Sequence, residues 1–211
     1  MSDEKAENSP KIGEYYLIWP DYDAPAHEVD FVNADRLRPT GQVVIRPKSG
    51  GFPELSEVPL LHQTHRNHDL GDFNDGFEGY WLVSHSLKNV LEGVDARGFE
   101  FVKCEYRLFD GSVGPNYYLC DVLRSLDAID DDASEVEILT DGLALGKFYN
   151  IAKGARLAFK KDVISGAHIF RSPFDDFMFV CDRVMRDALV EQGFGAFEGG
   201  RGMAIYDAAD Y

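Results

Sequence analysis

The sequence of 211 residues predicts an α+β fold with a mixed, mainly antiparallel sheet. Two observations lead to this fold class. Short helical patterns are interspersed among many short runs of strand-forming residues, without the regular alternation of a parallel sheet. In addition, Tyr80–Val102 and Phe177–Phe197 each combine an apolar strand, a capped helix, a glycine and a further strand. The sequence therefore predicts two strand–helix–strand units.

The length and composition indicate one folded domain. A chain of this size buries about 70% of its unfolded surface, which is enough for a core without disulfides. Apolar residues make up 45% of the chain and charged residues 27%, which excludes global disorder and a coiled coil. We expect residues 1–13 to be a disordered lead-in and residues 14–211 to be a single domain, with residues 14–79 and 80–211 as its two candidate lobes.

The first strands are predicted from apolar runs that end at Pro or Gly. Tyr15–Trp19 is aromatic and branched and stops at Pro20, and Gln42–Arg46 is a second candidate. Residues 60–70 show weak helical spacing. Residues 71–79 are rich in Gly and Asp, which predicts a loop.

A capped helix and a long strand follow in the middle of the chain. Trp81–Val83 is a short apolar strand, and Ser84 is a suitable N-cap for a helix that runs to about Val94. The apolar positions of this helix keep helical spacing at Leu87, Val90, Leu91 and Val94. Apolar residues then alternate with charged ones, at Val102, Cys104, Tyr106 and Leu108, which predicts one half-buried strand before a turn at Asp110-Gly111.

The C-terminal half contains further strands and a second helix. Tyr117–Asp130 begins like a strand, and a helix is the alternative for this stretch. The other strand candidates are Val136–Leu139, Arg156–Lys160, His168–Phe170 and Phe177–Val180. We expect a helix over Asp182–Gln192 whose buried stripe consists of Val184, Met185, Ala188 and Leu189, and a last strand near the end of the chain.

The charge of the chain limits the classes of partner that it can bind. Lys and Arg total 21 against 37 Asp and Glu, a formal net charge of −16. Such a chain repels phosphate backbones and anionic membranes, so nucleic acid and membrane surfaces are poor partners and a basic protein is a good one. No apolar run is long enough to span a bilayer, and the acidic N-terminus has no apolar signal segment, so we expect a cytoplasmic location.

One acidic run offers a candidate partner-binding surface. Between positions 121 and 137 there are seven acids and one base, Arg124. A run of this kind is either a solvated face or a docking surface for a basic partner, and the sequence leaves both readings open. The candidate residues are Asp121, Asp127, Asp130, Asp131, Asp132, Glu135 and Glu137.

A group of histidines suggests an alternative to a binding protein, namely a metal-dependent enzyme. The sequence contains the spacing His62-x-x-His65-x-x-His68, followed by Asp69. If this segment were a helix, His62, His65 and Asp69 would lie on one face, where they could bind zinc together with a water molecule. A solvated polar segment explains the same residues. Neither an HExxH motif nor a GxSxG nucleophile elbow occurs, so we predict no cofactor and no enzyme activity. The three cysteines, Cys104, Cys120 and Cys181, are expected to be buried thiols.

Three segments resemble a known family. Tyr117–Asp130 (YYLCDVLRSLDAID) resembles the tyrosine-pair segment of the immunity-protein 11 family of bacterial polymorphic toxin systems. Trp81–Glu92 (WLVSHSLKNVLE), with Gly98-Phe99-Glu100-Phe101 after it, and His168-Ile169-Phe170-Arg171, with Phe177–Leu189 after it, fit the same family. The resemblance covers roughly residues 80–198, and Cys181 replaces the serine that is usual in the family.

The resemblance implies a cytoplasmic protein of bacterial competition that binds and neutralises a cognate toxin. The acidity of the chain favours a basic toxin, and a nuclease is one such toxin because its cleft must contact phosphates. A third hypothesis is an adaptor module that has no toxin partner.

Overall fold

The fold is that of a computed structural model, which describes residues 9–22, 29–66, 70–195 and 200–211. The chain divides into two compact units. Unit 1 is Met1–Trp19, Arg124–Ala188 and Ile205–Tyr211, and unit 2 is Pro20–Leu123 and Leu189–Ala204. The predicted lobe boundary between residues 79 and 80 falls inside unit 2, within a pair of neighbouring strands. The α+β fold class with mostly antiparallel sheets is confirmed.

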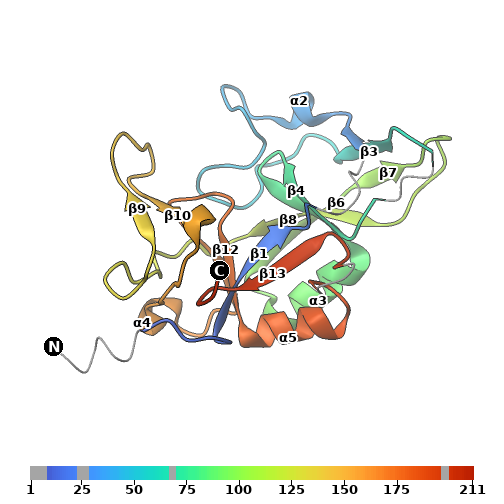
Figure 1. Cartoon of the computed structure of the whole chain (residues 1–211). Helices are drawn as coiled ribbons and strands as arrows, with labels where there is room; N and C mark the ends of the chain where they lie inside the picture. Colours follow the sequence, from blue (N-terminus) through green and yellow to red (C-terminus); the bar gives the residue numbers. More distant parts are fainter. Residues whose placement is uncertain (1–8, 23–28, 67–69, 196–199) are drawn as a thin grey trace. The chain divides into compact units, whose positions relative to one another are not determined.

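Unit 2 is built around a four-stranded antiparallel sheet in the order β4-β5-β8-β6 (Figure 1). These strands are β4 (Phe73–Phe77), β5 (Tyr80–Ser84), β6 (Phe99–Lys103) and β8 (Tyr117–Val122). Side chains alternate between the faces, so the pair Leu82–Leu119 points to one face and the pair Trp81–Cys120 to the other. All five residues of β5 are buried, because both faces of the sheet are covered.

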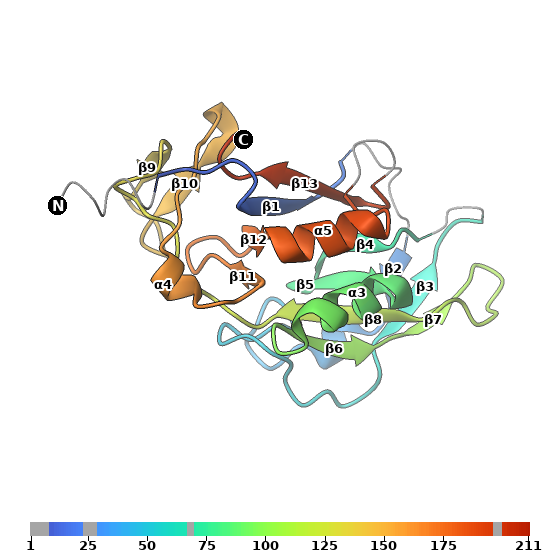
Figure 2. The same ribbon diagram turned by 90° about the horizontal axis from the view of Figure 1, so that it is seen from below.

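Helix α3 (His85–Asp95) covers one of these faces, as Figure 2 shows. The Ser84 hydroxyl accepts a hydrogen bond of 3.2 Å from the Leu87 amide, so the predicted N-cap is confirmed. Leu87 and Leu91 are completely buried, as their spacing predicts.

A three-stranded sheet and short irregular segments cover the other face. Its order is β2-β3-β7, with β3 and β7 parallel, and its strands are β2 (Val29–Phe31), β3 (Leu60–Gln63) and β7 (Glu105–Arg107). Leu61 and Tyr106 from this sheet and Ile45 from a loop join Leu82 and Leu119 in one core cluster. The short helix α2 (Ala34–Leu37) adds Leu37 to the same cluster.

Unit 1 contains a second four-stranded sheet, in the order β11-β12-β1-β13. The strands are β1 (Tyr15–Pro20), β11 (Ile169–Arg171), β12 (Phe179–Asp182) and β13 (Met203–Asp207), whose first residues are assigned to unit 2. The predicted lead-in is ordered at its end, because the Gly13 amide donates to Asp207 and the Gly13 carbonyl accepts from Arg183. Residues 1–8 of that lead-in lie outside the described residues.

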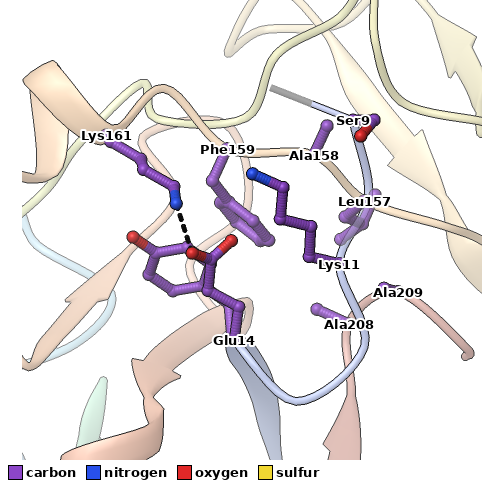
Figure 3. A pocket seen from close by; sticks show the side chains of 10 residues that line it. Ser9, Lys11, Glu14, Leu157, Ala158, Phe159, Lys161, Ala208 and Ala209 are labelled. Carbon is purple, nitrogen blue, oxygen red and sulfur yellow. Dashed lines mark hydrogen bonds and ion pairs between the residues drawn. The ribbon is translucent and has the colours of Figure 1, made fainter. Parts of the chain in front are cut away.

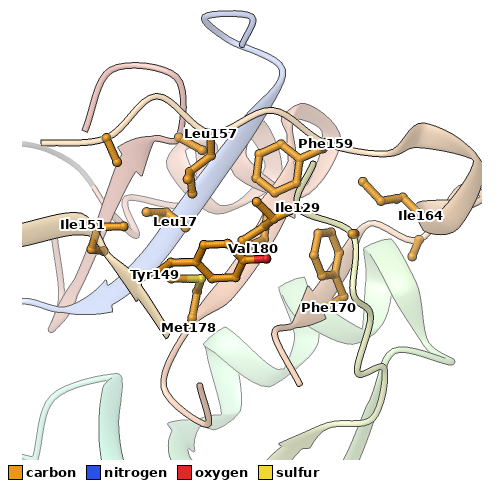
Figure 4. Close-up of a cluster of buried hydrophobic side chains, with 14 residues drawn as sticks. Leu17, Ile129, Tyr149, Ile151, Leu157, Phe159, Ile164, Phe170, Met178 and Val180 are labelled. Atoms are coloured by element: carbon orange, nitrogen blue, oxygen red, sulfur yellow. The ribbon is translucent and has the colours of Figure 1, made fainter. Parts of the chain in front are cut away.

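A hairpin and a long irregular segment complete unit 1. The hairpin consists of β9 (Glu137–Leu139) and β10 (Phe148–Asn150), and it is followed by the 3-10 turn η1 (Ile151–Lys153) and the short helix α4 (Lys161–Ile164). Buried side chains from these parts and from the sheet form one apolar cluster. Figure 4 shows the ring of Tyr149 among Leu17, Ile129 and Met178 in this cluster.

Helix α5 (Arg183–Glu191) follows β12 directly, as the sequence predicts. The Asp182 carboxylate accepts a hydrogen bond of 3.0 Å from the Met185 amide and so takes the part that Ser84 takes for α3. The predicted stripe is wrong at Val184, which is 55% exposed, whereas Met185 and Leu189 are buried. Residues four apart in a helix share a face, so Met185 and Leu189 lie together on the buried face. Val184 is one position before Met185 and lies on an adjacent, exposed part of the helix.

Several predicted elements differ in the structure. Gln42–Arg46 is an irregular loop, because the Arg46 amide donates to Glu78 instead of to a ladder partner. Residues 60–63 form a strand instead of part of a helix, and residues 73–77 pair with β5 although their Gly and Asp content predicts a loop. Arg156–Lys160 makes only isolated bridges.

The long strand predicted from Val102 to Leu108 is divided at Cys104. Its halves, β6 and β7, belong to different sheets, and the Cys104 amide donates to the carbonyl of Tyr117 between them. Strict alternation of apolar residues continues through the break, so the pattern could not reveal it.

Candidate partner-binding surface

The acidic run does not form one surface, because its first member is buried. Asp121 lies in β8 of unit 2, and its side chain is 3% exposed. It accepts a hydrogen bond of 2.6 Å from Arg46 Nε and another of 2.6 Å from the Gly51 amide. Asp121 therefore holds the loop of Arg46 against the sheet, and its expected role in partner binding is corrected to a structural one.

The remaining six acids belong to unit 1, and Asp131 is tied to the hairpin. Lys147 Nζ lies 2.7 Å from one carboxylate oxygen of Asp131, and the Tyr149 hydroxyl donates to the other at 2.6 Å. Partial burial raises the pKa of Asp131, but the bonds from Lys147 and Tyr149 and the charge of Lys147 together lower it below its ordinary value. Asp131 thus links the acidic segment to the Tyr149 ring in the core.

Lys147 is largely covered by its neighbours. Its side chain is 14% exposed, it reaches Asp127 at 3.4 Å, and its ammonium lies 4.4 Å from the ring centre of Phe174. Because Asp127, Asp131 and the Phe174 ring surround the Lys147 ammonium, its positive charge is balanced within unit 1 and contributes little to the outer surface.

Most of the other acids are exposed, and three of them make local contacts. The Asp130 carboxylate accepts from the amides of Asp132 and Ala133 and so stabilises the turn that follows it. Glu135 pairs with Arg156 at 3.2 Å, and Glu137 accepts from Asn150 at 2.5 Å across the hairpin. Residues 127–141 contain seven acids, and ion pairs join them to Lys147, Arg156 and Lys160, so acids outnumber bases in this part of unit 1.

The same hairpin exposes apolar side chains. Leu139 and Phe148 are cross-strand partners in β9 and β10, and they are 43% and 37% exposed. Their neighbours Ile138 and Tyr149, one position along each strand, point to the opposite face and pack on the core. The connecting loop adds two further exposed side chains, Leu143 at 38% and Leu145 at 51%.

Sequence reasoning missed these four residues, although a signal was present. Asp141-Gly142 marks a turn between two short apolar runs, which is a hairpin pattern. Leu143 and Leu145 lie within that turn segment, where polar residues are usual. Apolar residues in a predicted turn would have pointed to this part of the chain.

A cavity beside β1 does not suit a substrate. It has a volume of about 10 Å³ and is lined by residues of unit 1, among them Lys11, Tyr15 and Phe159. Figure 3 shows Glu14 and Lys161 forming an ion pair beside it. A space of this size holds about one water molecule.

Two larger hollows are open to solvent. One, of about 460 Å³, lies between Lys11–Tyr15 and the start of α5. The other, of about 310 Å³, lies beside β7 and includes Cys104, Tyr106 and Val113. Burial raises the pKa of Cys104 to about 12, so its thiol is not a nucleophile at neutral pH. All three cysteines are buried and free, as expected.

The geometry on which the metal alternative depends is not formed. His62 belongs to strand β3, where neighbouring side chains alternate between faces, so His62 and His65 do not share a helix face. His68 and Asp69 lie outside the described residues. Within the parts of the chain that the structure describes, no three His, Cys, Asp or Glu side chains gather to form a metal site.

Comparisons with known proteins identify the family. Over the described residues, the helices are too short or too polar for any of them to cross a membrane. No curated protein matches the sequence. The model of the Immunity protein family (Imm11) matches residues 13–210, nearly the whole chain and more than the roughly 80–198 covered by the resemblance. The chain therefore belongs to the Imm11 immunity protein family.

Proposed function

We propose that this protein neutralises a cognate bacterial toxin by binding it directly. The observation that carries the proposal is the match to an immunity protein family over residues 13–210. Binding without catalysis suits the site, whose residues are ion-paired acids and apolar side chains and include no activated nucleophile. Tight binding that covers the toxin's working surface is sufficient for neutralisation.

The toxin in this proposal is a basic protein. Support comes from the net charge of −16 and from the run of acids without Lys or Arg at residues 127–141. Opposite charges speed the encounter of two proteins and disfavour wrong partners. A nuclease toxin fits this description, because a cleft that contacts phosphates is lined with Lys and Arg.

The test combines binding with protection of cells. The protein is purified and mixed with an inactive form of the toxin encoded beside its gene, and complex formation is measured by titration calorimetry. In parallel, cells that produce the active toxin are scored for survival with and without this chain. We expect a one-to-one complex and restored growth.

Two controls define the outcome. An unrelated acidic protein of similar charge should neither bind the toxin nor protect the cells, because charge alone does not provide shape and apolar contacts. If this chain does not bind the neighbouring toxin, the proposal is wrong. If it binds and the toxin does not cleave DNA or RNA, only the nuclease assignment is wrong.

A further inference from the structure

The hairpin β9–β10 carries apolar side chains on both of its faces, although only one face covers a core. The inner pair, Ile138 and Tyr149, packs on the apolar cluster of unit 1. The outer pair, Leu139 and Phe148, faces solvent. A hairpin with one solvated face normally carries polar residues there, so this outer pair departs from the ordinary pattern.

The exposed apolar residues of the hairpin are concentrated. Leu139, Leu143, Leu145 and Phe148 lie within ten consecutive residues, and each is more than a third exposed. Single apolar side chains on a surface need no explanation, whereas a group of them marks an interaction site. We call these four residues and their connecting loop the hairpin tip.

Negative charge adjoins the hairpin tip. Glu137 is on the outer face of β9, two positions from Leu139, and Asp141 is in the loop. Lys147, the base nearest in sequence, is enclosed by Asp131 and Phe174, so its charge does not offset these acids. An apolar centre beside acids is complementary to an apolar patch with basic residues around it.

We propose that the hairpin tip is the docking surface for the basic toxin. This inference rests on the proposed function and adds to it the place of contact. The leucines and Phe148 supply the contacts that desolvate on binding and slow dissociation, while the acids mainly speed association.

The experiment separates these two contributions. In the first variant, Leu143→Asn is combined with Leu145→Asn, which removes apolar surface without changing charge. In the second, Glu137→Gln is combined with Asp141→Asn, which removes charge with little change of volume. Association and dissociation rates with the inactive neighbouring toxin are measured by surface plasmon resonance at low and high salt.

We expect distinct results from the two variants. The leucine variant should bind about a hundredfold more weakly, or about tenfold for each leucine, and mainly through faster dissociation. The variant at Glu137 and Asp141 should associate several-fold more slowly at low salt and match the wild type at high salt, where the Debye length falls to about 3 Å.

A matched control tests whether any exposed apolar residue would behave alike. Val32 and Val43 of unit 2 are 51% and 86% exposed in irregular segments. A variant with Val32→Asn and Val43→Asn should bind within about twofold of the wild type. Hydrogen exchange of the wild type with and without toxin gives a second measurement, in which residues 137–150 should become protected.

Three outcomes would overturn the inference. If the wild type binds and the leucine variant binds equally well, or if exchange protection falls outside residues 137–150, the docking site is elsewhere and the proposed function stands. If the wild type alone is a dimer that the leucine variant dissociates, the occupant is a second copy of this chain. If the wild type does not bind the toxin, both the function and the docking site are wrong.

Discussion

Asp121 in unit 2 and the hairpin tip in unit 1 depart in opposite ways from the usual distribution of residues. Asp121 is a charge inside the protein, and Leu139, Leu143, Leu145 and Phe148 are large apolar side chains on its surface. Asp121 has its partners within unit 2, in Arg46 and the Gly51 amide. The four apolar side chains of the hairpin tip remain partly exposed to solvent, because the described part of unit 1 does not bury them.

Whether such a residue has a partner inside the protein decides what its removal affects. A buried charge with an internal partner is part of the structure, and its removal should affect folding. An exposed apolar group without an internal partner adds little to folding, and its removal should affect binding. The stability of the isolated chain therefore separates the two kinds of residue.

The largest effect is expected at the buried ion pair. Asp121→Asn removes the charge that compensates Arg46, whose side chain is 8% exposed. Leaving one charge of a buried pair without its partner costs about 3–5 kcal/mol of stability. The free energy of unfolding from urea titration measures this loss.

A double-mutant cycle sharpens the same prediction. Arg46→Met and Asp121→Asn should together cost less than the sum of their separate effects, because the second change removes the charge left by the first. Additive effects would mean that the pair contributes no coupling. A loss below about 1 kcal/mol for Asp121→Asn would place this residue among ordinary surface acids.

The next effect compares a buried and an exposed apolar residue on two helices. Leu91 of α3 is completely buried, and Leu91→Ala should cost about 2–5 kcal/mol through lost burial and the cavity that remains. Val184 of α5 is 55% exposed, and Val184→Ala should change stability by no more than about 0.5 kcal/mol. Thermal and urea unfolding of the two variants provide the comparison. Equal losses would contradict the outer position of Val184.

The sequence predicts best those elements whose signals are local. The strand β5, the cap at Ser84 and helix α3 follow from neighbouring residues, and each of them is found. The second strand and helix, β12 and α5, are found in the same way. Caps and short apolar stripes depend on contacts within a few residues, which is why the sequence alone reveals them.

Elements that depend on distant partners are not readable in this way. Strand β4, which contains Gly76, forms because it pairs with β5. A register shift between Asn74 and Phe77 accommodates the Asp and Gly residues between them. The loop of Arg46 is fixed by Asp121, 75 positions away in the sequence. Local propensity contains no information about either partner.

The candidate site is predicted only in part, for a related reason. The density of acids at residues 127–137 is visible in the sequence, but a count of charges cannot show that Asp121 is buried while Asp132 is exposed. The apolar outer face of the hairpin depends on the register Leu139–Phe148, and this register becomes known only when the strands are paired.

A small effect is also expected at Asp131, the exposed counterpart of Asp121. Its side chain is 40% exposed and pairs with Lys147, so solvent screens the interaction. Asp131→Asn should therefore cost about 0–1 kcal/mol at neutral pH, far less than Asp121→Asn. The measurement is again the free energy of unfolding in urea.

The pH dependence of this variant identifies the source of its small effect. The pKa of Asp131 is lower in the folded protein than in the unfolded chain, so the ionised carboxylate favours folding. This contribution is present above the unfolded pKa and disappears as the pH falls through the folded pKa, where both states are protonated. The stabilities of wild type and Asp131→Asn should accordingly converge as the pH is lowered through the acid range. A difference that persists unchanged at the lowest pH at which the protein folds would assign the effect to the neutral contacts with Tyr149 instead of to the charge.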